Sequence, residues 1–194
     1  GEEPIELRKE ESERLRELVG QSDLGVLFEG EQARGETLGL EAQRDVVAIL
    51  GHGRYDPLRA PPVLVELADG PLGCAEIERI ALPPVVCLLS CGAARAPRVA
   101  GDAGTAHLGG AALVGGAEVV LLSDTDIEVE ATLELFEVFV ERLRAGEAPD
   151  EALRQARSAI RERDPRWSDP FFHSGLRLFG WGSDMCPSTE HPSF

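Results

Sequence analysis

Three runs that are hydrophobic except for Asp45 and Glu118 lie in the middle of the chain, and each is followed by small or polar residues. They span residues 45–50, 85–89 and 117–122. A continuous apolar run of this length is typical of a strand that is buried on both faces of a parallel sheet. Segments with helical periodicity lie between and after the runs, so strands and helices alternate along the chain. The pattern therefore predicts an α/β fold with a mostly parallel sheet flanked by helices.

Periodicity and turn residues assign the remaining segments. Helices are predicted at residues 4–19, 74–80, 105–114, 127–145 and 150–163. Short strands are predicted at residues 24–28 (or the end of a connection), 63–67 and 171–179. Residues 30–39 are predicted to be a loop or hairpin, and residues 53–62 a loop. Gly146 is expected to cap the C-terminus of one helix, and Asp150 is expected to be the N-cap of the next.

Length and charge narrow the classes of function. The 194 residues suit one domain with a single core. The 35 acidic and 19 basic residues give a formal net charge of −16, which argues against direct binding of nucleic acid and against anionic membranes. Such a surface attracts basic peptides or basic partner surfaces, and it also simply keeps a protein soluble. No apolar run approaches the about 20 residues that span a bilayer, and no signal peptide opens the chain, so we expect a cytoplasmic protein.

Cysteine and histidine usage argues against a disulfide framework and against a structural metal site. No C-x-x-C pair occurs, and the histidines do not fall at zinc-ligand spacings. We therefore expect free thiols in a reducing compartment, with no metal and no cofactor. The four cysteines are Cys74, Cys87, Cys91 and Cys186.

Residues with catalytic potential follow the three hydrophobic runs. His52 follows the first, Cys91 follows the second, and Asp124 with Asp126 follows the third. Ligands of open α/β sheets bind outside the carboxyl ends of the strands, so we expect these residues on one edge. A thiol needs a base to become a good nucleophile near neutral pH, and an imidazole is the usual one. The arrangement predicts a dyad of Cys91 as nucleophile and His52 as base, with no third member evident.

Glycines on both sides of His52 allow the backbone to approach a substrate closely. The N–H groups of Gly53 and Cys91 are predicted to form an oxyanion hole for a tetrahedral intermediate. Each of these residues also has a purely structural explanation, because a cysteine after a buried strand is often a packing residue. Cys87, inside the second hydrophobic run, is expected to be such a core residue.

Six motifs occur in a fixed order along the chain. They are Ala48-Ile-Leu-Gly-His-Gly53, Leu67-Ala-Asp-Gly70, Val85-Val-Cys-Leu-Leu-Ser-Cys91, Leu108-Gly-Gly-Ala-Ala-Leu-Val-Gly-Gly-Ala117, Ala152-Leu-Arg-Gln-Ala156 and Asp169-Pro-Phe-Phe-His-Ser-Gly-Leu-Arg-Leu-Phe-Gly180. In this order they resemble the CHAT proteases, which are caspase-like cysteine peptidases of the clan of caspases, separase and gingipains. The resemblance suggests a catalytic domain at residues 45–182, preceded by an N-terminal helix and connecting segment (1–44) and followed by a tail (183–194).

The resemblance implies a three-layer caspase-like fold and peptide-bond hydrolysis through a thioester on Cys91, with His52 as base and no cofactor. It also implies a regulated prokaryotic protease of antiviral defence, in some members under CRISPR control, that acts on a protein or peptide substrate. Because the chain begins with Gly1, we expect a fragment or subunit whose activating domain or partner protein lies outside it. Many relatives cut after Arg or Lys with an acidic residue in the pocket, so Asp124 is the preferred candidate for substrate binding and Asp126 the second.

Both aspartates also have a structural alternative, since aspartate at a strand end or before a helix is often a cap. Asp126 directly precedes the predicted helix at 127–145 and fits that role. The sequence also departs from the resembled family around the nucleophile, where Gly92-Ala93-Ala94 replace the usual polar residues. Specificity therefore cannot be copied from relatives.

Two other functions compete with a protease. A non-catalytic caspase-like module that binds partner proteins would have no need of both the Gly-His-Gly and the Ser-Cys-Gly motif. A nucleotide-binding α/β protein would carry G-x-x-x-x-G-K-[ST], or a G-x-G-x-x-G that opens a helix, and neither occurs in the chain. Of these interpretations, the cysteine peptidase accounts for both the Gly-His-Gly and the Ser-Cys-Gly motif.

Overall fold

Five strands form the central sheet of the computed structural model, which describes residues 13, 17, 26–28, 34–55, 63–93 and 107–180. The strands lie in the order β1-β2-β6-β7-β8. The first four run parallel, and β8 is antiparallel to β7. Their bounds are β1 (Val26–Phe28), β2 (Val46–Leu50), β6 (Val85–Leu89), β7 (Val119–Ser123) and β8 (Leu176–Gly180).

Hydrophobic cores lie on both faces of this sheet, and the side chains of β2, β6 and β7 alternate between them. In β6, Cys87 and Leu89 belong to one core, whereas Val86 and Leu88 belong to the other. All five residues of β2 and all five of β7 are buried. Burial on both faces explains why these strands are continuous hydrophobic runs rather than alternating patterns.

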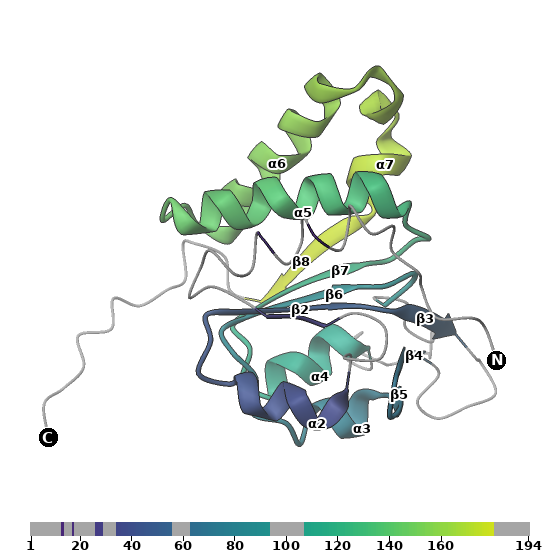
Figure 1. Ribbon diagram of the computed structural model, residues 1–194, viewed down its shortest axis with the longest axis vertical. Coiled ribbons are helices and arrows are strands. Elements are labelled where there is room, and N and C mark those ends of the chain that lie inside the picture. Colours follow the sequence, from purple (N-terminus) through teal and green to yellow (C-terminus); the bar gives the residue numbers. More distant parts are fainter. Residues whose placement is uncertain are drawn as a thin grey trace, which may run out of the picture.

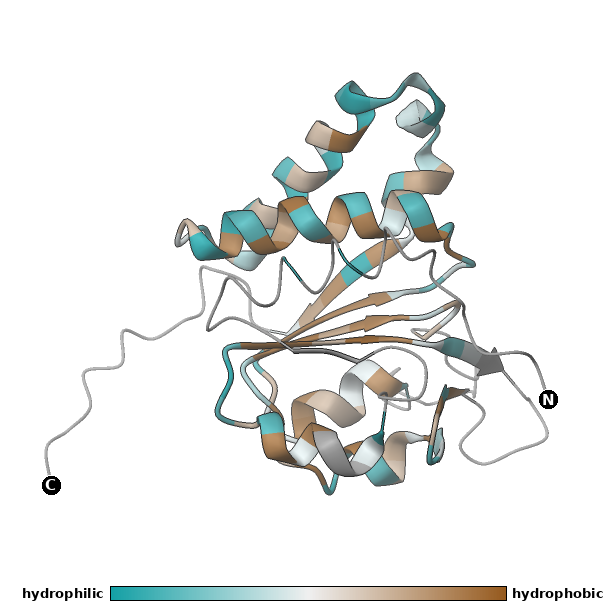
Figure 2. Cartoon of the chain, in the orientation of Figure 1, coloured by the Kyte–Doolittle hydropathy of each residue, from teal (hydrophilic) through white to brown (hydrophobic). Residues whose placement is uncertain are grey.

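Helices cover both faces of the sheet and give the molecule three layers (Figure 1). One outer layer contains α5 (Val129–Arg144), α6 (Pro149–Arg163), η3 (Pro165–Ser168) and α7 (Pro170–Ser174), and the other contains α2 (Gly35–Leu38), η2 (Gly39–Glu41), α3 (Cys74–Ile77) and α4 (Leu108–Val114). The strands are mainly hydrophobic, whereas the long helices carry hydrophilic residues as well (Figure 2). The predicted α/β fold of the caspase-like type, with a mostly parallel sheet flanked by helices, is confirmed. No helix within the described ranges has the length and apolar character needed to cross a membrane.

A second, three-stranded antiparallel sheet continues from the carboxyl end of β2. It consists of β3 (His52–Tyr55), β4 (Val63–Leu67) and β5 (Gly70–Leu72). The prediction of a loop from residue 53 is therefore wrong for residues 53–55, because these residues pair with β4. Residues 56–62 lie outside the described residues. The small sheet matters for function because β3 carries His52.

The prediction of a loop or hairpin at residues 30–39 is also wrong where the structure describes that segment. A short helix begins at Gly35, whose N–H donates to Asp69 Oδ1 at 3.0 Å. Leu38, at its end, is 1% exposed and belongs to the core beneath α4. The helix is stabilised by a hydrogen bond to Asp69, which is distant in sequence, and by the burial of Leu38. Neither feature can be recognised from the local sequence pattern.

Two further predictions need correction near the C-terminal part of the fold. The segment predicted as a strand at 171–179 begins as helix α7, which Asp169 caps by accepting from the Phe171 N–H at 2.9 Å. Asp150 is not an N-cap, because α6 already begins at Pro149 with Ala148 in the cap position. In the predicted helix at 4–19, residues 13 and 17 are helical and the rest lies outside the described residues, as do residues 105 and 106.

Candidate active site

The predicted site residues lie at one edge of the central sheet, where β2, β6 and β7 end. These three strands are parallel neighbours, with Leu50 beside Leu89 and Leu88 beside Leu122. His52 lies two residues beyond the end of β2, and Cys91 lies two residues beyond the end of β6. Asp124 directly follows β7. The parallel register brings together residues that are far apart in the sequence.

Gly53 lies directly against the backbone of Cys91. A Cβ atom at Gly53 would be 1.9 Å from the carbonyl oxygen of Cys91, 2.9 Å from its carbonyl carbon and 3.1 Å from its nitrogen. Any other residue would overlap the backbone of Cys91, so glycine is required by the close approach. This contact places β3, and with it His52, beside the segment that carries the cysteine.

Replacing Gly53 with alanine is expected to destabilise the protein by about 3 kcal/mol, because backbone atoms rather than a flexible side chain oppose the new methyl group. Urea unfolding of Gly53→Ala measures the loss. Gly39→Ala is the matched control, since a Cβ there would meet only Ile80 Cγ2 at an ordinary 3.8 Å. A Gly53→Ala protein as stable as the Gly39→Ala protein would show that the two segments are not in contact.

Cys91 differs from the other described cysteines in its surroundings. It is partly exposed, as Cys74 is too, but its Sγ accepts a hydrogen bond from the Ile127 N–H at 3.5 Å. Cys87 is fully buried in the core, as predicted, and burial raises the pKa of its thiol. Burial also raises the pKa of the Cys74 thiol, and the neighbouring Glu78 carboxylate raises it further. The environments of Cys87 and Cys74 therefore both disfavour the reactive thiolate form.

The turn at residues 123–127, which begins with the last residue of β7, is linked to the Cys91 segment. The Gly92 N–H donates to the Thr125 carbonyl oxygen at 2.9 Å. Ser123, which is 0% exposed, donates through its hydroxyl to the same oxygen at 2.8 Å and accepts from the Thr125 N–H at 3.2 Å. Sequence patterns did not reveal these residues, because most of their contacts to the site are made by backbone atoms.

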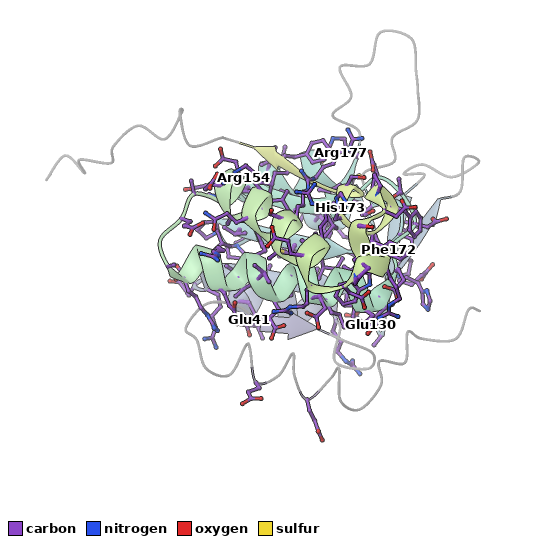
Figure 3. All side chains as sticks on the ribbon, turned by 90° about the horizontal axis from the view of Figure 1, so that it is seen from above. Glu41, Glu130, Arg154, Phe172, His173 and Arg177 are labelled. Carbon is purple, nitrogen blue, oxygen red and sulfur yellow. The ribbon has the colours of Figure 1, made fainter. Side chains whose placement is uncertain are left out.

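Asp124 forms an ion pair with an arginine of this same chain. Its Oδ2 lies 2.6 Å from Nε of Arg177, on β8, and its N–H donates to the Gly175 carbonyl oxygen at 3.2 Å. The Arg177 side chain is 61% exposed and lies at the periphery of the protein (Figure 3). The Asp124 carboxylate is therefore engaged by a guanidinium group, the same group that a substrate arginine would present.

Asp126 is exposed, and the interpretation of it as a helix cap is wrong. The N-cap of α5 is Glu128, whose carboxylate accepts from the N–H groups of Glu130 and Ala131 at 3.2 and 2.7 Å. Asp126 is thus a second carboxylate on the turn next to Cys91.

Glu66 is a candidate site residue that sequence reasoning missed. It lies directly opposite His52 in the β3–β4 register. Directly opposed residues of an antiparallel pair have Cβ atoms about 4.5–5.5 Å apart, on the same face of the sheet. The sequence at 63–67 suggests a short strand, but it gives no register with residues 52–55.

Across the described residues, no group of three or more His, Cys, Asp or Glu side chains is arranged to hold a metal ion. The chemical groups that meet at the carboxyl edge are a thiol, an imidazole, several carboxylates and backbone N–H groups. Such a set is suited to nucleophilic attack and proton transfer.

A three-layer α/β fold with a histidine and a cysteine after neighbouring parallel strands defines a protein of the caspase-like class. The comparison with family models agrees, since the model of the CHAT domain matches residues 3–182. The chain belongs to the CHAT domain family, a family of caspase-like cysteine peptidases. No curated protein sequence matches it.

Proposed function

We propose that this protein is a cysteine endopeptidase in which Cys91 is the nucleophile and His52 the base. The observation that carries the proposal is the backbone contact between Gly53 and Cys91, which brings two segments distant in sequence together at the carboxyl edge. Membership of the CHAT family supports the same chemistry. The arrangement also supports the choice of Cys91, because the Cys74 and Cys87 thiols have raised pKa values.

In the proposed reaction, His52 takes the proton of the Cys91 thiol as the sulfur attacks the carbonyl carbon of the peptide bond. The N–H groups of Gly53 and Cys91 stabilise the resulting oxyanion. His52 then gives the proton to the leaving amine, and the C–N bond breaks to leave a thioester on Cys91. Water, deprotonated by His52, hydrolyses the thioester and restores the thiol. Glu66, opposite His52, orients the imidazole and stabilises its charged form.

We propose further that cleavage follows a basic residue, with Asp124 binding the substrate cation and Asp126 as a second acidic residue. The ion pair between Asp124 and Arg177 supports this role, because the carboxylate already binds a guanidinium group of the same chain. A substrate arginine would replace Arg177 in that pair. The net charge of −16 also favours basic segments of a protein substrate.

Replacing Asp124 with asparagine is expected to lower kcat/KM for peptides with Arg before the cut by about tenfold to a hundredfold. The amide keeps the shape of the side chain but removes the charge that pairs with the guanidinium. Peptides with an uncharged residue at that position should be cleaved as before. Steady-state kinetics on matched Arg and Gln peptides give both values.

Asp150→Asn, on α6, is the control for a general loss of negative charge. Equal slowing of the Arg and Gln peptides by Asp124→Asn would contradict the specificity assignment. A selective loss in Asp126→Asn instead would assign the pocket to the second carboxylate.

We propose a cytoplasmic, regulated prokaryotic protease of antiviral defence, linked to CRISPR systems. It would be activated by a domain or partner protein outside this chain and would act without a cofactor, a membrane or direct contact with nucleic acid. The second candidate function is an inactive caspase-like module that binds partner proteins. The contacts at the carboxyl edge favour the enzyme, because Cys91 lies against the backbone of Gly53 and its sulfur accepts a hydrogen bond from the Ile127 N–H.

Cleavage of a positional-scanning fluorogenic peptide library by this chain tests the proposal. Turnover with a preference for Arg or Lys before the cut is the expected result. If the chain alone is silent, a peptide carrying an electrophile distinguishes the candidates: labelling of Cys91 indicates a formed site that awaits its activator. Absence of both turnover and labelling would favour the binding module.

A further inference from the structure

The turn at residues 123–127 holds a backbone donor against the sulfur of Cys91. The Ile127 N–H donates to Cys91 Sγ at 3.5 Å, which is within the range of hydrogen bonds to sulfur. The Gly92 N–H donates to the Thr125 carbonyl oxygen at 2.9 Å and joins the same two segments a second time. The turn and the nucleophile segment are therefore joined at two points, one of which is the reacting atom.

Ser123 fixes the shape of this turn from its buried side. Its hydroxyl bonds to both backbone polar groups of Thr125, donating to the carbonyl oxygen at 2.8 Å and accepting from the N–H at 3.2 Å. Thr125 lies two residues before Ile127, so its orientation sets the path of the chain toward the sulfur. The Ser123 side chain is 0% exposed and cannot exchange these partners for solvent.

The opposite side of the turn is closed by the segment that enters β8. The Asp124 N–H donates to the Gly175 carbonyl oxygen at 3.2 Å. A Cβ atom at Gly175 would lie 2.5 Å from Thr125 Oγ1 and 3.6 Å from Ser123 Oγ, so backbone and side chains are closely packed there. The turn is thus held between the Cys91 segment and the start of β8, with Ser123 bonded at its centre.

We propose that Ser123 is a positioning residue for the nucleophile: its hydroxyl holds the turn so that the Ile127 N–H stabilises the thiolate form of Cys91. The proposal rests on the proposed function only in taking Cys91 as the reactive thiol. A hydrogen bond to a charged acceptor is stronger than one to a neutral acceptor, so the Ile127 N–H favours the thiolate over the thiol. Loss of the Ser123 hydroxyl loosens the turn and weakens this preference.

Ser123→Ala and Ser90→Ala form a matched pair for the test. Each removes one hydroxyl from a residue that is 0% exposed at the end of a strand of the same sheet. Ser90 directly precedes Cys91, yet its Oγ has no hydrogen-bond partner among the described residues. The two variants therefore differ in whether the lost hydroxyl shapes the turn.

The measurement is the rate of alkylation of Cys91 by iodoacetamide, followed by mass spectrometry of the peptide that contains Cys91. Ser123→Ala is expected to react about fivefold more slowly than the wild type near about pH 7. Near about pH 10, above the usual range of cysteine thiols, the two rates should agree. Ser90→Ala should match the wild type at both pH values.

An unchanged rate for Ser123→Ala near neutral pH would overturn the proposal. Equal slowing at both pH values would also overturn it, because that result indicates lost access to the sulfur rather than lost stabilisation of the thiolate. If Ser123→Ala does not fold, Ile127→Pro removes the N–H donor itself and should slow alkylation near neutral pH about tenfold. A wild-type rate in Ile127→Pro would reject the proposal. Failure of the peptidase proposal is seen separately, as a wild-type protein that alkylates normally but cleaves no peptide.

Discussion

Peptide turnover is expected to fall by about 10⁴-fold or more when Cys91 is replaced with alanine, with the fold retained. In the proposed reaction this sulfur forms the covalent bond to the substrate, and no other described thiol lies at the carboxyl edge of the sheet. Cys87 is in the core and Cys74 is in α3 on the outer layer. Alanine removes one partly exposed sulfur atom, so the free energy of unfolding should change by less than about 1 kcal/mol. Fluorogenic peptide cleavage and urea unfolding measure the two quantities.

Cys74→Ala is the matched control for the loss of a thiol, because Cys74 is also partly exposed. Its turnover should equal that of the wild type. If Cys91→Ala retained turnover, another group would have to be the nucleophile. If instead Cys91→Ala lost its folded structure, the loss of activity would say nothing of catalysis, and Cys91→Ser, which keeps a similar shape, would replace it.

Replacing His52 with alanine is expected to reduce kcat by about 10²- to 10⁴-fold, the usual contribution of a general base. Without the imidazole, the thiol proton is lost to solvent and the leaving amine departs without a proton donor. His173→Ala is the control for the loss of a partly buried imidazole, since the bond that His173 makes to Arg157 uses its carbonyl oxygen and survives the substitution. Steady-state kinetics at several pH values provide the measurement.

Full activity in His52→Ala would contradict the dyad. Comparison with Glu66→Gln extends the result, because an orienting carboxylate acts only through the imidazole. Glu66→Gln should therefore lower kcat in the wild type and have no further effect in the His52→Ala background.

The central sheet could be predicted from the sequence because burial on both faces requires strands that are hydrophobic at nearly every position. β2, β6 and β7 are hydrophobic at nearly every position, and helices long enough to show periodicity, such as α5, connect or follow them. The strand ends could be located for the same reason, and with them His52, Cys91 and Asp124. Parallel pairing then brought these positions to one edge without any knowledge of side-chain contacts.

The short strand β4 could be predicted, but β3 and α2 could not be, because contacts distant in sequence determine them. β3 exists through its pairing with β4, and α2 depends on Asp69 and on the burial of Leu38. Likewise, Glu66 is opposite His52 only by virtue of the register between two strands. The contact of Ile127 with Cys91 is made by a backbone N–H, so the residue type at 127 carries no information about it. The Ser123 hydroxyl bonds to the backbone of Thr125, and this contact depends on the shape of the turn rather than on a sequence pattern.

The two members of the proposed dyad are carried by different sheets. Cys91 follows a strand of the central sheet, whereas His52 opens the small antiparallel sheet, and the contact at Gly53 joins the two. Proteins open in cooperative units whose free energies of opening differ, and a three-stranded sheet at an edge is a smaller unit than a sheet with cores on both faces. Separation of His52 from Cys91 is therefore expected to require only the free energy of opening the smaller unit. If these residues act as proposed, loss of the catalytic arrangement and global unfolding are two distinct equilibria, and the first is the easier one to shift.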